Sequence, residues 1–584
     1  MIHPIYTELT ECRDCYKCVR ACPVKAIQVK EGSAIIVKER CICCGICVDV
    51  CPSHAKKIRS DLQKVRQLMT EKKPVYCSLA PSAASEFGPH YRQLLTALTV
   101  LGFEGISETA IGAQLVNEAI EMYAKQHQGE CPWISTACPT VVEAVKTYYP
   151  ALIDQLSPVP SPLQCHSAYL RHLYGQHIGI VFIGPCIAKK LEADHNPGYP
   201  DFALSFEELR LWLELEGITF EQLEEAEERY VPAKAGSATL YPVEGGMIGS
   251  LSWGNDPFQT KALALSGFAQ VLDTLQSPEQ NHQFLELLFC EGGCINGPVA
   301  TKLSSAAQKK GAATRFTRSR LEQKQALFSS DPQFAQLLLT EGYALLGKSQ
   351  ETAKRQKPKS FTDEAILRAM KLLGKHSSAD ELNCGGCGYN DCRHMAAAYL
   401  EGMAEAEMCV TMMRKQAQSK IDVLLQTIPI GVVIVDDQLT IVDCNSFFLE
   451  QFANVEFAID NQSLNLVAGL PLQRFVPFYQ KFRSHFDNPK PCTYRIHCKD
   501  SYLKVTFFAI EKQHLVGALF EDITTATVRR DTVVKKAENV IQRSLETVQQ
   551  IASLLGENAA DTEITLNSLI EAFTTPTEEA GESV

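Results

Sequence analysis

The sequence predicts a multidomain protein of mixed α/β (α+β) structure that holds several metal centres, and three observations lead to this prediction. The chain has 584 residues, too many for a single hydrophobic core. It contains 23 cysteines, most of them in tight C-x2-C spacings that are typical of metal ligation rather than of disulfides. From about Lys73 to Ala300, short apolar runs alternate with amphipathic helical stretches, which indicates an α/β domain.

The charge and hydropathy of the chain exclude two classes of partner. The formal net charge of -12 and the pI near 5.7 argue against general binding to nucleic acid or anionic membranes, because phosphate surfaces repel such a field. Apolar runs such as Ile178 to Ile183 are far shorter than the roughly 20 residues that span a bilayer. The first ten residues lack the basic and apolar regions of a signal peptide. We therefore expect a cytoplasmic protein with no nucleic-acid partner and no membrane span.

Eight cysteines near the start form two copies of the run C-x2-C-x2-C-x3-C-P. A tight loop can turn three thiolates of a run onto one iron–sulfur cube, while the fourth cysteine reaches the other cube. The runs resemble the two-cluster ferredoxin signature, which predicts a two-[4Fe–4S] ferredoxin-like domain over residues 1–60 that carries electrons to another site. The resemblance assigns the first cluster to Cys12, Cys15, Cys18 and Cys51, and the second to Cys41, Cys44, Cys47 and Cys22. Cys43 lies outside the pattern, and a pair of zinc sites is the alternative interpretation.

Three apolar runs of the central region end beside loops that carry proline or cysteine. The runs are Val75 to Ala80, Ile178 to Ile183 and Leu285 to Phe289. Because ligand sites of α/β domains gather at the ends of strands, we expect these loops to share a site. Their cysteines stand in the segments S-T-A-C-P-T (135–140), G-P-C-I-A-K-K-L-E (184–192) and F-C-E-G-G-C-I-N-G-P (289–298).

Together these segments resemble the three H-cluster motifs of the [FeFe]-hydrogenase family, which makes residues 73–345 a hydrogenase-like H-cluster domain. The resemblance implies a [4Fe–4S] cube bound by Cys138, Cys186, Cys290 and Cys294. It implies that Cys294 also bridges to a diiron unit bearing CO, cyanide and a dithiolate. Lys189 matches the lysine that contacts one cyanide, and Ser82 lies in a segment similar to the one that contacts the other. Soft thiolates suit low-valent iron, and an ammonium group can donate to cyanide.

The sequence departs from the family pattern around the diiron half of this site. Ala137 stands where the family has a cysteine that relays protons, and an alanine methyl group cannot titrate. Gly184 and Leu288 replace two methionines of the motifs. Two alternatives follow: a complete H-cluster adapted to slow, reversible hydrogen binding, or a cube without the diiron unit. Retention of Lys189 and Ser82 favours the first alternative. Carboxylates that could relay protons are Glu118, Glu121 and Glu192, although charged residues on a helix such as 117–125 more often form a solvated face.

A polar, basic stretch over residues 346–374 predicts a linker, and a further cysteine motif follows it. The motif C-x2-C-x4-C-x16-C resembles the small [4Fe–4S] domain of corrinoid and membrane-redox proteins, here over residues 375–415. The resemblance assigns a third [4Fe–4S] cluster to Cys384, Cys387, Cys392 and Cys409. Neighbouring glycines let the backbone bend around such a site. Zinc is the alternative metal.

Residues 419–525 resemble a PAS domain. Two β-branched runs joined by a polar turn at Asp436 and Asp437 lead to a phenylalanine-rich helix that opens at Asn445. Strands near Thr493 to Cys498, Leu503 to Ala509 and Leu515 to Glu521 would complete a five-stranded sheet. We assign no cofactor to this domain, because its candidate ligands are isolated residues of kinds that are more often packed or solvated than metal-bound; they are Cys444, His485 and His497.

The last part, residues 526–584, is predicted to be a helical tail. Apolar residues recur every seven positions from Val534 to Leu555, which suits either a homodimer seam or packing onto the neighbouring PAS domain. A second short helix is expected near Asp561 to Phe573, and the acidic end is expected to be disordered.

The order of these parts resembles the sensory [FeFe]-hydrogenases, in which the same alanine-for-cysteine change accompanies a PAS domain and slow turnover. The resemblance implies an enzyme that slowly and reversibly binds or oxidises H2 at an H-cluster and relays the redox signal through [4Fe–4S] clusters to the PAS domain. The implied cofactors are three [4Fe–4S] clusters and the H-cluster. The implied partners are H2 and protons, a redox partner such as ferredoxin, hydrogenase maturation proteins, and a downstream signalling kinase or phosphatase.

Two other functions stay open at this point. One is a metabolic hydrogenase linked to ferredoxin, and the other is a non-catalytic, hydrogenase-related iron–sulfur protein without the diiron unit. The PAS domain counts against both, because neither bulk turnover nor cluster assembly requires one.

Overall fold

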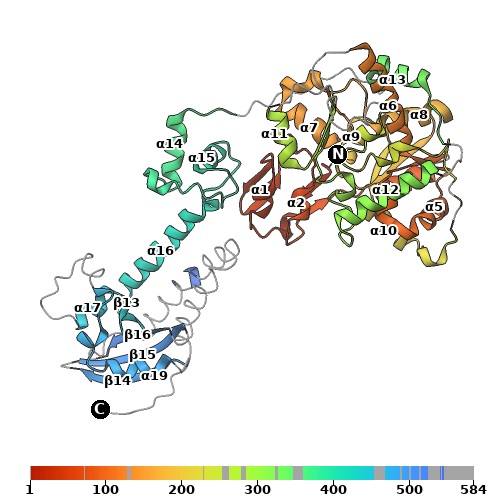
Figure 1. Cartoon of the computed structure of the whole chain (residues 1–584). Helices are drawn as coiled ribbons and strands as arrows, with labels where there is room; N and C mark the ends of the chain where they lie inside the picture. Colours follow the sequence, from red (N-terminus) through yellow and green to blue (C-terminus); the bar gives the residue numbers. More distant parts are fainter. Residues whose placement is uncertain are drawn as a thin grey trace. The chain divides into compact units, whose positions relative to one another are not determined.

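The computed structural model describes residues 2–71, 73–127, 133–225, 227, 229–252, 262–277, 284–322, 327–345, 359–452, 467–486, 490–498, 501–511, 514–523, 540 and 542–544. The chain forms two compact units. The first comprises residues 1–12, 17–363 and 400–404, and the second comprises residues 13–16, 364–399 and 405–584. Figure 1 labels the main elements of each unit.

The first unit begins with a small module that contains the two N-terminal cysteine runs except residues 13–16. Strand β1 (Ile5–Thr7) pairs antiparallel with β4 (Lys56–Ile58), so the two ends of the module lie together. Between them are η1 (Leu9–Glu11), α1 (Lys17–Ala21), the hairpin β2 (Ile27–Lys30) and β3 (Ser33–Ile36), and α2 (Ile46–Asp49). The hairpin turn uses Glu31 at φ 52° and Gly32 at φ 69°. Two successive positive φ values match the twist of a tight two-residue hairpin.

Two parallel sheets form the centre of the first unit. A four-stranded sheet has the order β6 (Gly105–Glu108), β5 (Val75–Leu79), β8 (Gly179–Gly184), β9 (Phe202–Ser205). A three-stranded sheet has the order β10 (Ala262–Ser266), β11 (Phe284–Leu288), β7 (Trp133–Ile134). The strands β5, β6, β8 and β11 are buried along their whole length, which explains the mainly apolar runs of β5, β8 and β11. The three predicted central strands are therefore confirmed.

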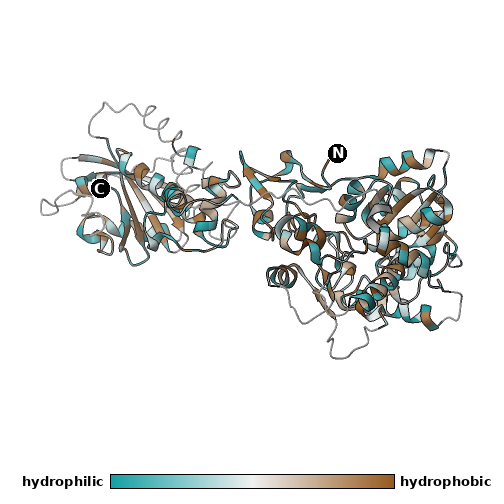
Figure 2. Ribbon diagram, turned by 90° about the horizontal axis from the view of Figure 1, so that it is seen from above, coloured by the Kyte–Doolittle hydropathy of each residue, from teal (hydrophilic) through white to brown (hydrophobic). Residues whose placement is uncertain are grey.

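Helices cover these sheets. In chain order they are α3 (Leu62–Thr70), α4 (Ala83–Phe87), η2 (Gly88–His90), α5 (Tyr91–Val100), α6 (Thr109–Gln126), α7 (Pro139–Tyr148), η3 (Pro150–Gln155), α8 (Pro162–Tyr174), α9 (Ala188–His195), α10 (Phe206–Leu215), η4 (Phe220–Gln222), η5 (Ser237–Leu240), η6 (Ile248–Ser250), α11 (Phe268–Gln276), η7 (Cys294–Asn296), α12 (Ala306–Glu322) and α13 (Pro332–Leu345). Helix α6 packs on α8 and α13, and the three lie together in Figure 1. Figure 2 shows brown, apolar strands between helices that carry both brown and teal residues, as expected for amphipathic helices that cover a sheet.

Local sequence explains where two of these helices start. Ser161 caps α8: its hydroxyl accepts from the Gln164 N–H, and the Gln164 side chain accepts from the Ser161 N–H. Ser205 and Glu208 form the same reciprocal arrangement at α10. Such capping boxes satisfy two otherwise unpaired backbone donors. The first of them also fixes the position of Ser161, which lies in the site described below.

Buried ion pairs join the end of the N-terminal module to the central helices. Arg59 bonds to Asp61 and to Asp194 at the end of α9. Lys190, with a side chain only 1% exposed, lies between Asp61 at 3.3 Å and Glu208 at 2.7 Å. Buried charges persist when they are paired in this way. The network therefore anchors α9 against both the module and α10.

The second unit contains the third cysteine motif. Its helices are α14 (Asp363–Leu372), η8 (Ser378–Asp380), α15 (Cys392–Leu400), η9 (Ala406–Met408) and α16 (Val410–Thr427). Helix α14 lies inside the range 346–374 that was predicted to be linker, so the linker prediction was too long at its end. Residues 363–372 contain no glycine or proline and place Ala369 and Met370 in the interior, which is enough to form a helix. Residues 346–358 lie outside the described part of the chain.

The remainder of the second unit is built on a five-stranded antiparallel sheet. Its order is β13 (Ile441–Cys444), β12 (Gly431–Asp436), β16 (Leu515–Asp522), β15 (Ser501–Glu511), β14 (Cys492–Cys498). Helices α17 (Ser446–Phe452), η10 (Leu472–Arg474), η11 (Tyr479–Phe482) and α19 (Arg483–Phe486) complete its described part. All five predicted strands are present. As expected, the Asp436 carboxylate accepts from backbone N–H groups in the hairpin turn, and Asn445 caps α17 through the Phe448 N–H.

The predicted C-terminal helices fall almost entirely outside the described residues, so the heptad prediction for 534–555 and the helix prediction for 561–573 stay untested. None of the helices that the structure describes is both long enough and apolar enough to cross a membrane.

Candidate functional site

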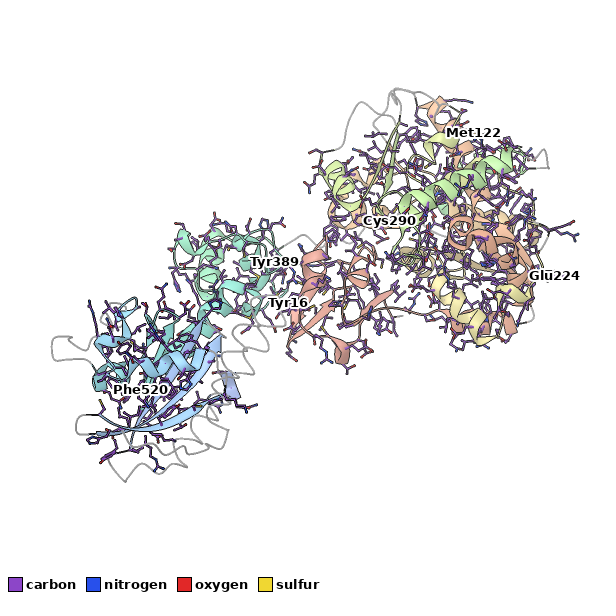
Figure 3. All side chains as sticks on the ribbon, turned by 60° about the horizontal axis from the view of Figure 1, so that its bottom comes forward. Tyr16, Met122, Glu224, Cys290, Tyr389 and Phe520 are labelled. Atoms are coloured by element: carbon purple, nitrogen blue, oxygen red, sulfur yellow. The ribbon has the colours of Figure 1, made fainter. Side chains whose placement is uncertain are left out.

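A cavity of about 870 Å³, measured out to its open mouth, lies where the two parallel sheets of the first unit end. All four cysteines predicted to bind the H-cluster line it, together with Ser82, Ala137 and Lys189. Figure 3 marks Cys290 within this part of the molecule. Most of the other lining residues are apolar, which is typical of an enclosed ligand site. The structure therefore brings together every residue that the sequence analysis assigned to this centre.

Each of these residues follows a strand at its carboxyl end. Ser82 comes after β5, and Cys186 comes after β8 of the same sheet. Cys138 follows β7 and is the N-cap of α7, while Cys290 follows β11. Because parallel strands present their carboxyl ends at one edge, loops far apart in sequence converge on this cavity.

Two glycines shape the loop between Cys290 and Cys294. Gly292 has φ +72° and Gly293 has φ +105°, conformations that disfavour any residue with a Cβ atom. A Cβ at Gly293 would lie 2.3 Å from the carbonyl oxygen of Pro242. The C-E-G-G-C sequence therefore allows the loop to turn tightly and direct both thiols into the cavity.

Burial favours the protonated thiol at three cysteines of this cavity. It raises the pKa of Cys186 to about 11 and raises those of Cys290 and Cys294 further, and neighbouring cysteines add to each effect. A metal centre here would have to displace these protons, because thiolates are the ligands.

Lys189 is buried in an ion pair that the sequence analysis did not predict. Its Nζ lies 2.5 Å from Glu192 Oε2, and it donates to Ser161 Oγ at 3.3 Å. Ser161 in turn donates to the other oxygen of Glu192. The sequence S-P-L-Q that starts at Ser161 indicates a capped helix, but nothing local indicates that this helix begins beside Lys189.

Among the described residues that line the cavity, Ser82 is the one with a fully buried polar side-chain atom that lacks a hydrogen-bond partner. The residue is 2% exposed, and its Oγ is buried without a hydrogen bond. An unpaired buried hydroxyl costs about 1–3 kcal/mol. A ligand that accepts a hydrogen bond in the cavity would remove this penalty.

The proton-relay candidates differ in position. Ala137 lines the cavity with a methyl group, while neither Glu118 nor Glu121 is among the described lining residues. Glu118 accepts from the Asp331 N–H at 3.2 Å, and burial raises its pKa. Glu121 accepts from the N–H of exposed Ser252. Of the three carboxylates, Glu192 is the one with a described ion pair to a cavity residue, namely Lys189.

Glu286 is a buried carboxyl group that the sequence analysis missed. It lies on β11, is 1% exposed, and accepts from the N–H groups of Gly245 at 3.1 Å and Ile248 at 2.9 Å. Burial raises its pKa to about 7. A single acid inside the apolar run F-L-E-L-L is the only signal of this residue in the sequence.

The assignment of the second N-terminal cluster to Cys22, Cys41, Cys44 and Cys47 stays a prediction, and all four residues lie in the first unit. Burial raises the thiol pKa of Cys22, Cys44 and Cys47, and other cysteines of the set add to each of these three effects. Cys44 packs against the apolar cluster that contains Cys138, Leu288 and Phe289, which line the cavity, so Cys44 lies near the cavity. For the first cluster, Cys12 follows η1, Cys18 lies in α1, Cys51 follows α2, and Cys15 lies in the segment 13–16 that belongs to the second unit. Their grouping stays a prediction.

The four cysteines of the third motif line one small pocket in the second unit. Cys384, Cys387, Cys392 and Cys409 share it with Lys375 and Thr411. The Thr411 hydroxyl lies 3.3 Å from Cys409 Sγ and accepts from the Lys375 ammonium.

The three candidate ligands of the sheet domain in the second unit lie on different elements. Cys444 is half-buried on β13, and His497 is exposed on β14. His485 is 3% exposed and stacks on Phe507, with ring centroids 4.7 Å apart. Neither of its ring nitrogens has a hydrogen-bond partner in the described structure, and burial lowers its pKa.

Comparisons with known families match three segments of the chain. Residues 73–298 match the model described as "Iron only hydrogenase large subunit, C-terminal domain". Residues 11–56 match a 4Fe-4S dicluster domain, and residues 380–411 match a family described as "Putative Fe-S cluster".

Curated relatives agree with these matches. The chain is 25% identical to Iron hydrogenase 1 of Clostridium pasteurianum over 363 residues, which cover 49% of this chain and 63% of that protein. It is 26% identical to the periplasmic [Fe] hydrogenase large subunit of Nitratidesulfovibrio vulgaris over 258 residues, or 35% of this chain and 61% of that one. It is also 27% identical to the cytosolic Fe-S cluster assembly factor NAR1 of Candida dubliniensis over 26% of this chain and 30% of the factor. The chain thus spans about three fifths of the length of the first two relatives.

Among solved structures, a variant of [FeFe]-hydrogenase HydA1 from Chlamydomonas reinhardtii aligns with 47% of this chain and 94% of its own, at 19% identity and a TM-score of 0.35. The PAS domain of an HTR-like protein from Haloarcula marismortui aligns with 19% of this chain and 94% of its own, at 19% identity and a TM-score of 0.15. Both scores are low. The family match over residues 73–298 and the curated relatives show that this part of the chain is similar to the iron-only hydrogenases.

Proposed function

We propose that this protein is a sensory [FeFe]-hydrogenase of low activity that binds and oxidises H2 reversibly and passes the redox change to a PAS domain. One observation carries the proposal: Ser82 and Lys189 line the same cavity as the four cysteines, beside Ala137. A cube alone needs only the thiolates. Two further hydrogen-bond donors at the same cavity support a centre that also bears acceptor ligands.

The residues present fit a complete H-cluster. Cys138, Cys186, Cys290 and Cys294 would hold the cube, and Cys294 would also hold the diiron unit, which supplies the site where H2 is bound and split. The orphan hydroxyl of Ser82 can donate to one cyanide. The Lys189 ammonium can donate to the other while Glu192 balances its charge. The apolar lining excludes water and strengthens both hydrogen bonds.

Slow turnover follows from the residue at position 137. A positioned acid–base group typically contributes about 10²–10⁴-fold to a rate, and Ala137 offers none. Protons must reach the cavity by another route. A sensor gains from this, since it reports hydrogen without consuming it in bulk.

Electrons would leave through the neighbouring clusters. The packing of Cys44 against the apolar cluster that contains Cys138 and Phe289 supports exchange between the N-terminal clusters and the cavity. The cluster at Cys384 to Cys409 would carry the redox change toward α16, which runs from Val410 without interruption to Thr427, just before the first strand of the proposed PAS domain. We propose ferredoxin as the redox partner. A kinase or phosphatase would be the downstream signalling partner. Maturation proteins would supply the diiron unit, and the tail would support a homodimer.

Infrared spectroscopy tests the central claim. The protein is purified without oxygen, matured with the diiron unit, and examined where iron-bound CO and cyanide absorb. Bands that shift under H2 support the proposal. Their absence after maturation, with the cube present, favours the alternative of a hydrogenase-related protein without the diiron unit, a function consistent with the similarity to the NAR1 assembly factor.

A further inference from the structure

Lys375 is a buried lysine, 7% exposed, that lines the pocket of the third cysteine motif in the second unit. Gly374 follows α14 with φ +69°, a left-handed conformation. The Lys375 N–H then bonds back to the Met370 carbonyl oxygen at 2.9 Å. Helices often end at a glycine in this way. The K-L-L-G-K sequence therefore sets where the backbone leaves the helix and places Lys375 beside the four cysteines.

No carboxylate pairs with Lys375 among the residues that the structure describes. Asp380 binds Lys415 at 2.7 Å, and Asp391, which lines the same pocket, contacts His394 Nδ1 at 2.7 Å. A buried ammonium group is costly unless an anion balances it. A cube held by four thiolates is such an anion. The residues present therefore fit the proposed third cluster.

Two hydrogen bonds lead from Lys375 to one predicted ligand of this cluster. The ammonium group has no acceptor, so it donates to Thr411 Oγ1. The hydroxyl of Thr411 keeps its own proton for Cys409 Sγ, which lies 3.3 Å away. A cysteine that binds iron is a thiolate and accepts. The geometry thus directs one donor at the sulfur of Cys409.

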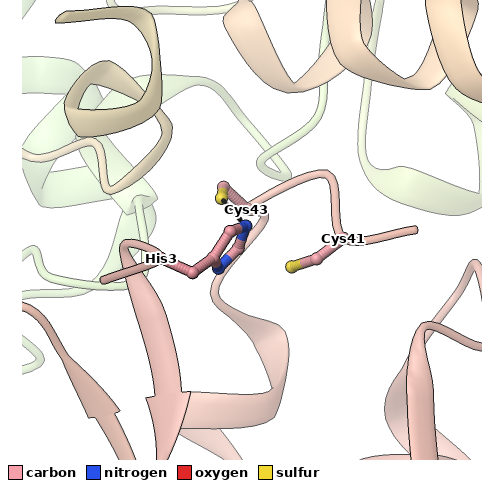
Figure 4. A group of neighbouring side chains, drawn as sticks. All are labelled: His3, Cys41 and Cys43. Atoms are coloured by element: carbon pink, nitrogen blue, oxygen red, sulfur yellow. Dashed lines mark hydrogen bonds between the residues drawn. The ribbon is translucent and has the colours of Figure 1, made fainter. Parts of the chain in front are cut away.

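Cys43 of the N-terminal module shows the contrasting arrangement. His3 Nδ1 lies 2.9 Å from the Ile5 carbonyl oxygen, which can only accept, so Nδ1 carries the ring proton. His3 Nε2 then accepts from the Cys43 thiol at 3.5 Å (Figure 4). This thiol is paired with an imidazole and not directed at a predicted ligand.

The bond from Thr411 lies at the start of α16 and on a buried ligand. Cys409 is the N-cap of α16, and Thr411 is the second residue of that helix. Cys409 is 8% exposed, whereas Cys384 is exposed. A hydrogen bond is stronger where the surroundings exclude water. Of these two ligands, Cys409 is therefore the one at which a protein donor has the greater effect.

We propose that Lys375 and Thr411 are positioning residues that raise the reduction potential of the third cluster. Reduction adds one electron to the cube, supplied in the protein by the other proposed clusters. The Thr411 hydrogen bond and the Lys375 charge both stabilise the added negative charge. Because Thr411 belongs to the first turn of α16, this helix contacts the group whose charge changes. The inference rests on the third cluster of the proposed function but not on the diiron unit.

The test uses the full-length protein with reconstituted iron–sulfur clusters and a redox titration followed by electron paramagnetic resonance. Cys384→Ala combined with Cys387→Ala removes the third cluster and identifies its signal by difference. Thr411→Val should shift the midpoint potential of that signal to a more negative value and leave the others unchanged. Thr411→Ser retains the hydroxyl and should keep nearly the wild-type value.

Lys375→Met removes the charge and should also shift this potential to a more negative value. It keeps the Thr411 hydroxyl beside Cys409, so it decides the question if Thr411→Val loses iron. Lys415→Met is the matched control. It removes a lysine of α16 whose side chain is 67% exposed, and it should leave the potential unchanged.

Four results would overturn the inference. Unchanged potentials in Thr411→Val and Lys375→Met at full iron content would show that neither group acts on the cluster. An equal shift in Thr411→Ser would assign the effect to packing, and an equal shift in Lys415→Met would assign it to net charge. Zinc in this pocket, found by metal analysis with no matching signal, would remove the cluster itself. Infrared bands report the diiron unit independently, so failure here is distinguishable from failure of the proposed hydrogenase function.

Discussion

Lys189 and Glu192 form an ion pair in the interior, with Nζ 2.5 Å from Oε2 and side chains that are 10% and 7% exposed. The two residues lie three positions apart on α9, so they face the same side of the helix. Lys189 lines the cavity together with the four predicted cysteine ligands, and the Glu192 carboxylate pairs with its ammonium group.

Glu192→Gln should therefore destabilise the protein. Removing one partner of a buried pair leaves an uncompensated charge and costs about 3 kcal/mol or more. Chemical denaturation of the cofactor-free protein measures the effect. Glu227→Gln is the matched control, because the Glu227–Arg229 pair is more than four fifths exposed and its loss should change the unfolding free energy by less than about 1 kcal/mol. Equal effects of the two changes would contradict a buried role for Glu192.

Ala137→Cys should raise hydrogen turnover. The new thiol would line the cavity and supply an acid–base group, an addition typically worth about 10²–10⁴-fold. We expect an increase of about 10-fold, below that range, because neither Glu118 nor Glu121 is among the described residues of the cavity to continue the path. Hydrogen uptake by the matured protein is the measurement, and Ala137→Ser is the control with a hydroxyl that does not titrate near neutral pH. If wild-type turnover already equals that of the cysteine variant, proton supply does not limit the rate.

Glu286 should make stability depend on pH. Its pKa is about 7 in the folded protein and 4.5 as the ordinary value, so the folded state binds this proton more tightly. The stabilisation is fully present below pH 4.5 and is lost as pH rises through 7. Its size is on the order of 3 kcal/mol.

Glu286→Gln removes this dependence. The unfolding free energy of the variant, relative to wild type, should rise between pH 5 and pH 8 in cofactor-free protein. A constant difference across this range would show that Glu286 stays ionised in the fold.

His485→Phe should stabilise the second unit. The imidazole is buried against Phe507 with both nitrogens unpartnered in the described structure, and a buried unpaired polar group costs about 1–3 kcal/mol. The temperature at which that unit unfolds should therefore rise. His497→Phe changes an exposed position and should alter this temperature little. A lower stability in His485→Phe would mean that the ring nitrogens bind a ligand in the native protein.

Removal of residues 419–584 tests whether the C-terminal part is signalling machinery. The cut falls within α16 but keeps Cys409 and Thr411 of the third cysteine pocket. Hydrogen chemistry should persist while the effect of H2 on the partner protein disappears. Activity assays and partner assays on the same preparation give the two readouts. Lost hydrogen chemistry in a protein with full iron content would assign these residues a structural role.

Much of this molecule could be predicted from short stretches of sequence. The C-x2-C spacings, the five strands of the C-terminal sheet and the buried runs of β5, β8 and β11 are local features. A loop of three or four residues or a run of β-branched side chains limits backbone conformation regardless of what packs on it. Ala137 is of the same kind, because a missing thiol is visible in the sequence.

Other features depend on parts of the chain that are distant in sequence. Ser161 reaches Lys189 and Glu192 because α8 and α9 flank one sheet, and the order β6-β5-β8-β9 places strands about 100 residues apart side by side. The contact of Cys43 with His3 and α9, the isolation of Ser82 Oγ and the burial of Glu286 arise in the same way. Burial and hydrogen-bond satisfaction are properties of the packed interior, so residue type and spacing cannot indicate them before the sheets assemble.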